Sequence, residues 1–411
     1  MPWATAAQGH RAVGFSVQRV WQFVRVGLVG VGISCAALVG QQRSDPGVSL
    51  LDRVAEQLSE HYLDRSFCDR ELPELLARFR DQADRATSPA QERAVVHALL
   101  AQVPASHLAL LSRSTHQWFE AELFGQPSPM LGCSLVRIGE KFYIDSVYAG
   151  GPAAEAGLRR GEEVLAICGE DPLDSPWLDW RSDDAHLTDP ASYRFVVIEG
   201  QVVELQVGAD RPREVALVAR PWSALRASSE GVSELPLGNT RALYVPLWFV
   251  YHERAARLLA EALRAHPDCG GLLLDLRGRG GSALECAVIL RVLHRAKARG
   301  LSIVALTDSR TRSAKEILAL ELRRRALATL VGERTAGAVL VADFAPLSEE
   351  AVLMLPVARL SYSAALEGSG VAPDVPCRDP LPATPGADPI LWAGLQTLEG
   401  MLNRSTLADS R

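Results

Sequence analysis

Residues 301–316 read LSIVALTDSRTRSAKE and place a serine between a strand and a helix. Leu301 to Leu306 is apolar and β-prone, whereas Ala314 to Leu327 carries apolar residues at helical spacing. Ser313 therefore stands at the junction. Backbone N–H groups at a helix start are unpaired, so an oxyanion that forms beside Ser313 would be stabilised there. The structural alternative is that Ser313 and Glu316 form the capping box of an ordinary helix.

A second junction of the same form lies at residues 271–282, which read GLLLDLRGRGGS. The apolar run predicts a buried strand, and the glycines predict a turn before a helix. Gly280 and Gly281 have no side chains, so their N–H groups can approach a reacting carbonyl closely. The simpler interpretation is an ordinary turn with a structural Asp275–Arg277 pair. Both turns follow the carboxyl ends of strands, the edge where α/β sites form.

Strand and helix patterns alternate through the second half of the chain. This alternation predicts an α/β fold with right-handed crossovers and a largely parallel sheet. Strands are expected at 243–249, 272–276, 302–306 and within 339–362, and helices at 254–266, 284–298, 314–327 and 389–402. The core would span residues 235–402, with a disordered tail at 403–411. Apolar residues at helical spacing also predict a small helical region at 46–125.

Residues 150–165, GGPAAEAGLRRGEEVL, resemble the second half of a PDZ domain, with Glu162 in the place of the usual Asp. Short strands with glycine turns predict that this domain spans residues 126–222. Leu131, Gly132 and Cys133 stand where PDZ domains have their carboxylate-binding loop. This resemblance implies that an extended peptide with a free C-terminus adds to the sheet edge. The alternative is that the domain only braces the active site.

The PDZ-like segment, the glycine turn, the Ser313 helix and VGERTAGA at 331–338 occur in an order that resembles the C-terminal processing (tail-specific) serine peptidases. The resemblance covers roughly residues 48–402. It implies an extracytoplasmic protease of protein substrates, with a crotonase-like (ClpP/crotonase-type) catalytic core and an inserted PDZ domain. Ser313 would be the nucleophile and would need no cofactor. The oxyanion hole implied by the resemblance consists of N–H groups of Gly280 or Gly281 and of Ala314.

One departure from that family concerns the general base, which a serine hydroxyl needs. Most members carry a lysine where this chain has Ala338, and the three lysines here are Lys141, Lys297 and Lys315. Lys315 lies two residues after Ser313 on the same helix and so points to nearly the opposite side. None of the lysines is therefore expected to be the base.

A different set of residues resembles the tricorn-core branch of this superfamily, which also lacks the lysine. In that branch a Ser-His pair after the N-terminal helices supplies the base, and a Glu from the C-terminal part completes a tetrad. The matching positions here are Ser106, His107 and Glu367. The resemblance implies that His107 is the general base and that Ser106 and Glu367 orient its imidazole.

Two other functions stay open. A catalytically inactive relative could bind proteins through the PDZ domain, and the missing lysine and Arg279 in the usual Asn place of the glycine turn favour it. Chemistry on acyl-thioesters of the crotonase type would fit the core fold, but it would not fit the PDZ-like or N-terminal segments.

The N-terminal segment has the form of a secretory signal. Arg11, Arg19 and Arg25 precede an uncharged apolar run at residues 26–40. Counted from residue 20, the run is long enough to be an uncleaved membrane anchor instead. Either interpretation sends the rest of the chain across a membrane, into the periplasm or outside the cell.

Composition narrows the remaining classes of function. The 411 residues suffice for two or three domains, and a net charge of −6 without a basic cluster argues against a nucleic-acid partner. Six cysteines follow Cys35 and could form up to three disulfides in an oxidising compartment. None has Cys-x-x-Cys spacing, which argues against a zinc site.

Overall fold

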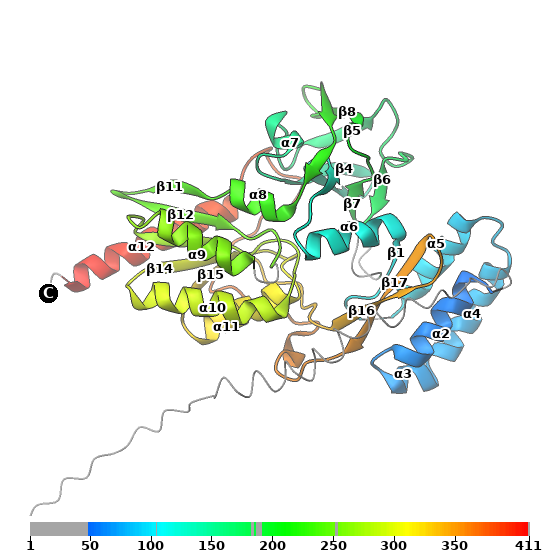
Figure 1. Ribbon diagram of the computed structural model, residues 1–411. Helices are drawn as coiled ribbons and strands as arrows, with labels where there is room; N and C mark the ends of the chain where they lie inside the picture. Colours follow the sequence, from blue (N-terminus) through cyan, green and yellow to red (C-terminus); the bar gives the residue numbers. More distant parts are fainter. Residues whose placement is uncertain (1–47, 104, 182–184, 186–190, 251–253, 410–411) are drawn as a thin grey trace, which may run out of the picture. The chain divides into compact units, whose positions relative to one another are not determined.

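The computed structural model describes residues 48–103, 105–181, 185, 191–250 and 254–409 (Figure 1). The predicted signal or anchor segment at residues 1–45, with Cys35, lies outside these residues. Within them, no helix combines the length and the apolar character that crossing a membrane requires. The chain from Pro46 onward is one compact unit.

A six-stranded sheet forms the framework of the second half of the chain, in the order β11-β12-β13-β14-β15-β18. The pairs from β12 to β18 are parallel, as the strand-helix alternation predicts, and β11 is an antiparallel edge strand. The strands are β11 (Ser233–Leu237), β12 (Thr240–Pro246), β13 (Gly271–Asp275), β14 (Ser302–Thr307), β15 (Thr329–Gly332) and β18 (Val375–Pro376). The strand predicted at 243–249 begins and ends three residues earlier, at a proline that has no N–H for the ladder.

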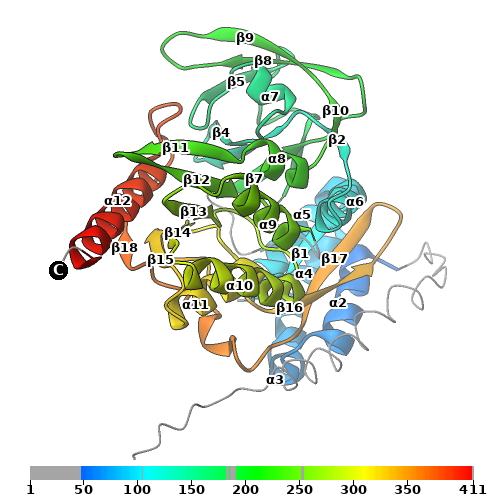
Figure 2. The same cartoon turned by 60° about the vertical axis from the view of Figure 1, so that its left-hand side comes forward.

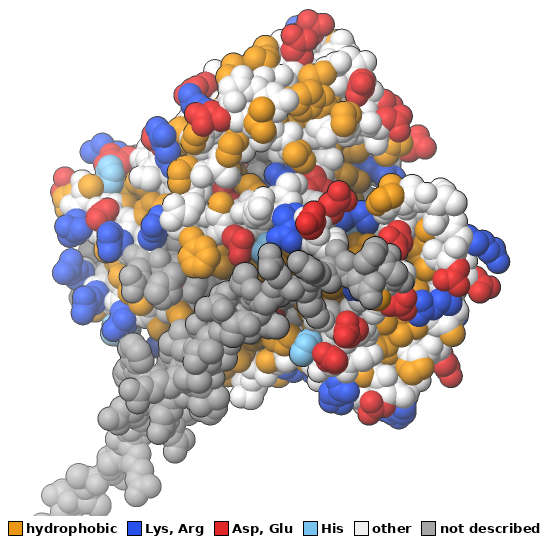
Figure 3. Space-filling model, turned by 45° about the vertical axis from the view of Figure 1, so that its right-hand side comes forward, with side chains coloured by type: hydrophobic (Ala, Val, Ile, Leu, Met, Phe, Trp, Pro, Cys, Tyr) orange, Lys and Arg blue, Asp and Glu red, His pale blue; other side chains and the backbone are white. Residues whose placement is uncertain are grey.

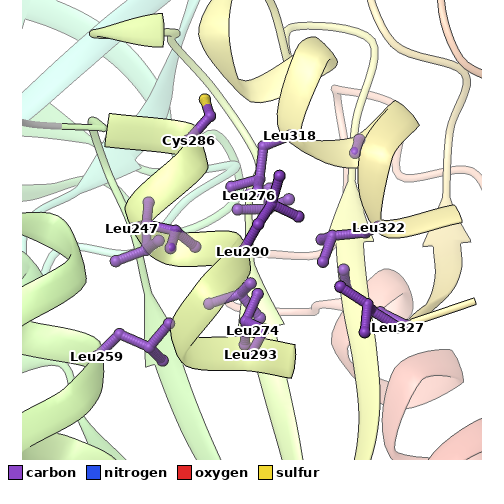
Figure 4. Packing of buried hydrophobic residues seen from close by; sticks show 14 of the residues in the cluster. Leu247, Leu259, Leu274, Leu276, Cys286, Leu290, Leu293, Leu318, Leu322 and Leu327 are labelled. Carbon is purple, nitrogen blue, oxygen red and sulfur yellow. The ribbon is translucent and has the colours of Figure 1, made fainter. Parts of the chain in front are cut away.

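Helices cover both faces of this sheet (Figure 2). The crossover helices α9 (Ala255–Ala265), α10 (Ala283–Ala298) and α11 (Ala314–Arg324) pack on one face, and α12 (Pro389–Asp409) packs on the other. Successive side chains of β13 point to opposite faces of the sheet. Leu272 and Leu274 pack with the crossover helices, whereas Leu273 packs with α12. Figure 4 shows leucines from the sheet and from α9, α10 and α11 converging in the first layer.

Two predicted helix ends are wrong. Helix α11 ends at Arg324, three residues early, because Ala326 takes a positive φ of 50° and Leu327 N–H bonds to Leu322 O at 2.9 Å. This is a Schellman motif. Helix α12 continues to Asp409, so residues 403–409 are helical rather than disordered.

The N-terminal helices pack on a separate three-stranded sheet of order β1-β17-β16. The helical region was predicted, but this sheet was not, because its strands come from opposite ends of the chain. The elements are α2 (Leu50–His61), α3 (Arg65–Arg70), α4 (Leu72–Asp84), α5 (Pro89–Leu100), β1 (Ala109–Ser112), α6 (Arg113–Leu123), β16 (Val341–Pro346) and β17 (Ala351–Ala358).

The region predicted as a PDZ domain contains a seven-stranded antiparallel sheet, in the order β6-β7-β3-β4-β5-β8-β9. Its strands are β3 (Cys133–Ile138), β4 (Lys141–Val147), β5 (Glu163–Ile167), β6 (Leu178–Trp180), β7 (Ala191–Phe195), β8 (Val202–Val207) and β9 (Arg213–Val218). The short helix α7 (Pro152–Glu155) follows β4. A small ladder of β2 (Ser128–Met130) and β10 (Arg220–Trp222), followed by α8 (Ala224–Glu230), leads back to the six-stranded sheet.

The six cysteines of the described residues are all free thiols, so the disulfides that an oxidising compartment would allow do not form here. They are Cys68, Cys133, Cys168, Cys269, Cys286 and Cys377. On the face shown in Figure 3, acidic and basic side chains both occur across the surface.

We expect Leu274→Ala to lower the free energy of unfolding by about 2–5 kcal/mol, because the side chain is fully buried between β13 and the crossover helices. The matched change Val202→Ala, at a half-exposed position of β8, should cost less than about 0.5 kcal/mol. Urea titration of both variants measures the difference. Equal losses would contradict this assignment of the core.

Candidate active site

Ser313 lies on a strained turn between β14 and α11. Its φ of 56° and ψ of −127° fall in a region that side-chain-bearing residues rarely adopt. Its N–H donates to Ala338 O at 2.8 Å. Four non-glycine residues in the described parts of the chain have positive φ, and two of them are Ser313 and His107, both predicted from the sequence as site residues. A comparable strained strand-to-helix turn presents the nucleophile in α/β-hydrolases.

The glycine turn lies directly against Ser313. A methyl group at Gly280 would lie 2.6 Å from Ser313 Cβ and 3.3 Å from Ser313 Oγ, so only glycine fits there. Gly281 has a φ of 141°, and a methyl group on it would lie 2.4 Å from Val250 O. The N–H groups of Gly280 and Ala314 donate to no acceptor in the described residues. The structure therefore brings two unpaired donors of the predicted oxyanion hole next to the predicted nucleophile.

Ser106, His107 and Glu367 form one hydrogen-bonded chain, although 261 positions separate Ser106 from Glu367. Ser106 Oγ lies 3.0 Å from His107 Nδ1 and donates to Glu367 Oε2 at 3.2 Å, and Ser106 N–H reaches Glu367 Oε1 at 3.3 Å. A hydroxyl has one proton, so a Ser106 that donates to the carboxylate must accept from Nδ1–H. In a neutral imidazole this network places the proton on Nδ1, and Nε2 is then the nitrogen that can accept a proton.

Glu367 also connects this chain to the Ser313 turn. Its Oε2 accepts the N–H of Val339 at 2.9 Å, and the carbonyl of the preceding Ala338 accepts the N–H of Ser313. His107 and Ser106 are both buried. The predicted nucleophile and the predicted imidazole thus belong to one continuous network that passes through residues 338–339.

The buried carboxylate of Glu316 holds that segment in place. It accepts Thr335 Oγ1 at 2.6 Å and the N–H groups of Gly337 and Ala338, each at 2.7 Å. It also accepts Ser313 N–H at 3.2 Å, which is one half of the predicted capping box. Burial raises the pKa of Glu316, and the hydrogen bonds from Thr335, Ala338 and Gly337 oppose that shift. Glu316 therefore caps the start of α11 and also holds the segment next to Ser313, so a helix cap and an active site are compatible at this turn.

A further carboxylate, Asp308, fixes the other side of the turn. It accepts Gly278 N–H at 2.9 Å and pairs with Arg310 at 3.0 Å. Burial would raise the pKa of Asp308, but Arg310 and the hydrogen bond from Gly278 hold it at about 2. Arg310 also pairs with Asp145 on β4, which ties the seven-stranded sheet to the loop that leads to Ser313. Sequence reasoning missed these residues, because ordinary charged residues carry no motif.

Lys315 makes its hydrogen bonds with two backbone carbonyls. The side chain is fully buried, and Nζ donates to the carbonyls of Arg277 at 2.7 Å and Trp248 at 3.2 Å. Burial lowers its pKa from 10.5 to about 7, although Asp275 and Asp308 oppose the shift. Lys297, the other lysine after residue 150, lies in the last turn of α10.

The predicted carboxylate-binding loop, Leu131, Gly132 and Cys133, lies between β2 and β3. Gly132 has a φ of 75°, and the N–H groups of Leu131 and Gly132 donate to no acceptor among the described residues. The edge of β3 opposite β4 is not open, because β7 pairs there with Ser134 opposite Arg194 and Leu135 opposite Tyr193. The end strands of this sheet are β6 and β9. A peptide that adds to β3 must therefore take the place of β7.

The β6–β7 pair is itself fastened to α6. Arg194 on β7 donates to the hydroxyls of Thr115 and Ser114, each at 2.8 Å. Asp179 on β6 accepts the Thr115 hydroxyl and lies 3.8 Å from the Arg194 guanidinium. Phe195 at the end of β7 is buried in the core of the sheet. These contacts support the alternative in which the domain braces the active site.

The chain is similar to known peptidases. Residues 293–377 match the model of peptidase family S41. The matched segment contains Ser313, Glu316 and Glu367. The chain is also 27% identical over 282 residues to a carboxyl-terminal-processing protease of Synechocystis sp., in an alignment that covers 61% of this chain. It spans 64% of the length of that relative. Both similarities support a serine peptidase.

One solved protease structure has a similar fold, and a second gives a weaker match. The photosystem II D1 C-terminal processing protease superposes with a TM-score of 0.51 at 18% identity, and the match covers 85% of this chain and 96% of that protein. The tricorn protease gives a TM-score of 0.47 at 16% identity, with 86% of this chain and 36% of that protein covered. The described residues contain no cluster of three or more His, Cys, Asp or Glu side chains able to hold a metal ion.

We expect Gly280→Ala to reduce labelling of Ser313 by a fluorophosphonate probe by about 10²-fold or more, because the added methyl group displaces the nucleophile and one oxyanion donor. Gly400→Ala is the control, since its methyl group would meet nothing closer than 3.6 Å in helix α12. Mass spectrometry of the labelled peptide gives the rate at residue 313. Unchanged labelling of the Gly280→Ala chain would refute the contact.

Proposed function

We propose that this protein is a serine endopeptidase of the extracytoplasmic side that hydrolyses protein substrates through an acyl-enzyme on Ser313. The observation that carries the proposal is the hydrogen-bonded chain Glu367–Ser106–His107, joined through residues 338–339 to a strained Ser313. An inactive binding protein needs neither the strained serine nor a buried imidazole that Ser106 and Glu367 hold in place. The inactive alternative therefore has less support.

In the proposed mechanism, Ser313 Oγ attacks the scissile carbonyl while His107 Nε2 takes the hydroxyl proton. The N–H groups of Gly280 and Ala314 stabilise the oxyanion. His107 then protonates the leaving amine, the peptide C–N bond breaks, and the acyl group stays on Ser313. Water attacks this ester with His107 again as the base. Ser106 and Glu367 hold the imidazole tautomer, the arrangement of the lysine-lacking, tricorn-core-like branch.

The proposed location and substrates follow from two further features. The basic and apolar pattern of residues 11–40 supports export with or without a membrane anchor. The relatives named as C-terminal processing proteases support protein substrates. A PDZ domain with a crotonase-like core stays our interpretation of the two large sheets. In it, Leu131, Gly132 and Cys133 hold a peptide carboxylate once β7 has left β3.

We expect Ser313→Ala to abolish peptide hydrolysis and probe labelling while the chain stays folded, because alanine keeps the backbone contacts of the turn. His107→Gln should lower kcat by about 10²–10⁴-fold. In the unaltered protein, activity should fall on acidification, since a protonated imidazole cannot accept the hydroxyl proton. Hydrolysis assays from pH 5 to 9 with circular dichroism as the folding control measure both effects. Full turnover by either variant would remove that residue from the mechanism.

Binding of one apolar-ended peptide, as the free acid and as the C-terminal amide, tests the domain of the seven-stranded sheet. A domain that reads a carboxylate should bind the acid more tightly, and Arg194→Ala should strengthen that binding by loosening β7. Fluorescence anisotropy with the Ser313→Ala chain avoids hydrolysis during the measurement. Equal affinities for acid and amide in both chains would leave the bracing role.

A further inference from the structure

Lys315 is fully buried two residues after the proposed nucleophile, and its role here rests on the proposed peptidase function. We propose that Lys315 is a positioning residue that clamps the oxyanion turn, residues 277–281, to the helix that carries Ser313. Helix α11 would then supply both the nucleophile and the contact that sets the distance from the nucleophile to the oxyanion donors.

Hydrogen bonds on both sides of the turn converge on the ammonium group. Nζ donates to Arg277 O, the carbonyl at the start of the turn, at 2.7 Å. It also donates to Trp248 O at 3.2 Å, in the segment that follows β12. That segment holds the far end of the turn, because Val250 N–H donates to Gly280 O at 3.0 Å and Val250 O accepts Ser282 N–H at 2.7 Å. Lys315 thus holds residues 277–281 in two ways: directly through Arg277 O, and indirectly through the segment of Trp248 and Val250.

The chemistry of this place favours a lysine over an apolar side chain. The carbonyls of Arg277 and Trp248 would otherwise lack these donors, and an unmade buried hydrogen bond is costly. A flexible stem with three donors can serve both carbonyls from one atom. Because the amine serves backbone carbonyls at the turn, its contacts are those of a clamp and not of a base for the serine.

Two carboxylates and two guanidinium groups act on the charge of the Lys315 ammonium. Asp275 ends β13 and Asp308 follows β14, whereas Arg277 opens the glycine turn and Arg310 precedes α11. The carboxylates favour the ammonium, and the guanidinium groups and burial oppose it, so the pKa falls to about 7. The amine therefore loses its charge near neutral pH, and its hydrogen bonds to the two carbonyls weaken as pH rises.

Lys315→Met keeps the stem and removes the donors, so it is the direct test. We expect kcat and fluorophosphonate labelling to fall about 10- to 100-fold with KM unchanged within about twofold, because a displaced oxyanion hole affects the transition state more than binding. Hydrogen exchange of residues 277–281 should speed up. The control Lys297→Met alters a half-exposed lysine in the last turn of α10 and should change none of these.

The pH profile gives a readout that a structural lysine would not share. The unaltered enzyme should lose activity as pH rises through about 7, on top of the acid limb, and Lys315→Met should lack this alkaline limb. The folded pKa lies below the ordinary 10.5, so the unfolded chain binds a proton that the folded chain releases. The stability of the unaltered chain should therefore rise between pH 7 and 10 relative to the variant.

Several outcomes would overturn the clamp. A Met variant with normal kcat, or one that loses activity with unchanged exchange at residues 277–281, is incompatible with it. Should the variant fail to fold, hydrogen exchange of residues 277–281 in the unaltered chain still tests the clamp. The clamp requires that their exchange rate rises more between pH 6 and 9 than the exchange rate of β13 does. These exchange measurements do not need peptidase activity, so an inactive protein would refute the proposed function and leave the clamp testable.

Discussion

The buried carboxylate of Glu316 is the interaction on which the rest of the site depends. Its two oxygens accept four donors from the start of α11 and from residues 335–338. A carboxylate without these donors would be expensive to bury, and the donors without it would be unpaired. Because Ala338 O in turn accepts Ser313 N–H, the strained conformation of the serine is fixed by a hydrogen-bonded ring and not by the turn alone.

From this ring, contacts extend to the Ser106–His107 pair and to the seven-stranded sheet. Val339 carries them to Glu367 and the Ser106–His107 pair, next to the strand β1 that packs with the N-terminal helices. Asp308 and Arg310 carry them to Asp145 in the seven-stranded sheet. The β6–β7 pair adds a second brace through Arg194 and α6. The proposed catalytic groups come from distant parts of the sequence, so their geometry depends on the three-, six- and seven-stranded sheets.

Local chemistry made part of this arrangement predictable from the sequence. Ser313 and Gly280 stand at strand-to-helix junctions, and parallel strands bring such junctions to one sheet edge, so their proximity followed from periodicity and turn residues. His107 and Glu367 were reached only through a resemblance, since one histidine among nine has no local signature. The pairing of β7 with β3 and of β1 with β17 depends on long-range contacts that alternating apolar residues do not specify. The burial of Lys315 could not be predicted from the sequence either, because a lysine on a helix is usually exposed.

Ser313 and Gly280 compete for the same small volume, and this has a consequence for how such chains can diverge. A side chain at position 280 is compatible only with a helix start that has moved, and a moved helix start no longer presents a nucleophile to the turn. We therefore expect the two positions to change together among related chains, although they are 33 positions apart in the sequence. We expect a relative with alanine or a larger residue at the position of Gly280 to have lost catalysis, even if its serine were still present. Covariation between the two positions would thus separate active descendants from those retained for their shape.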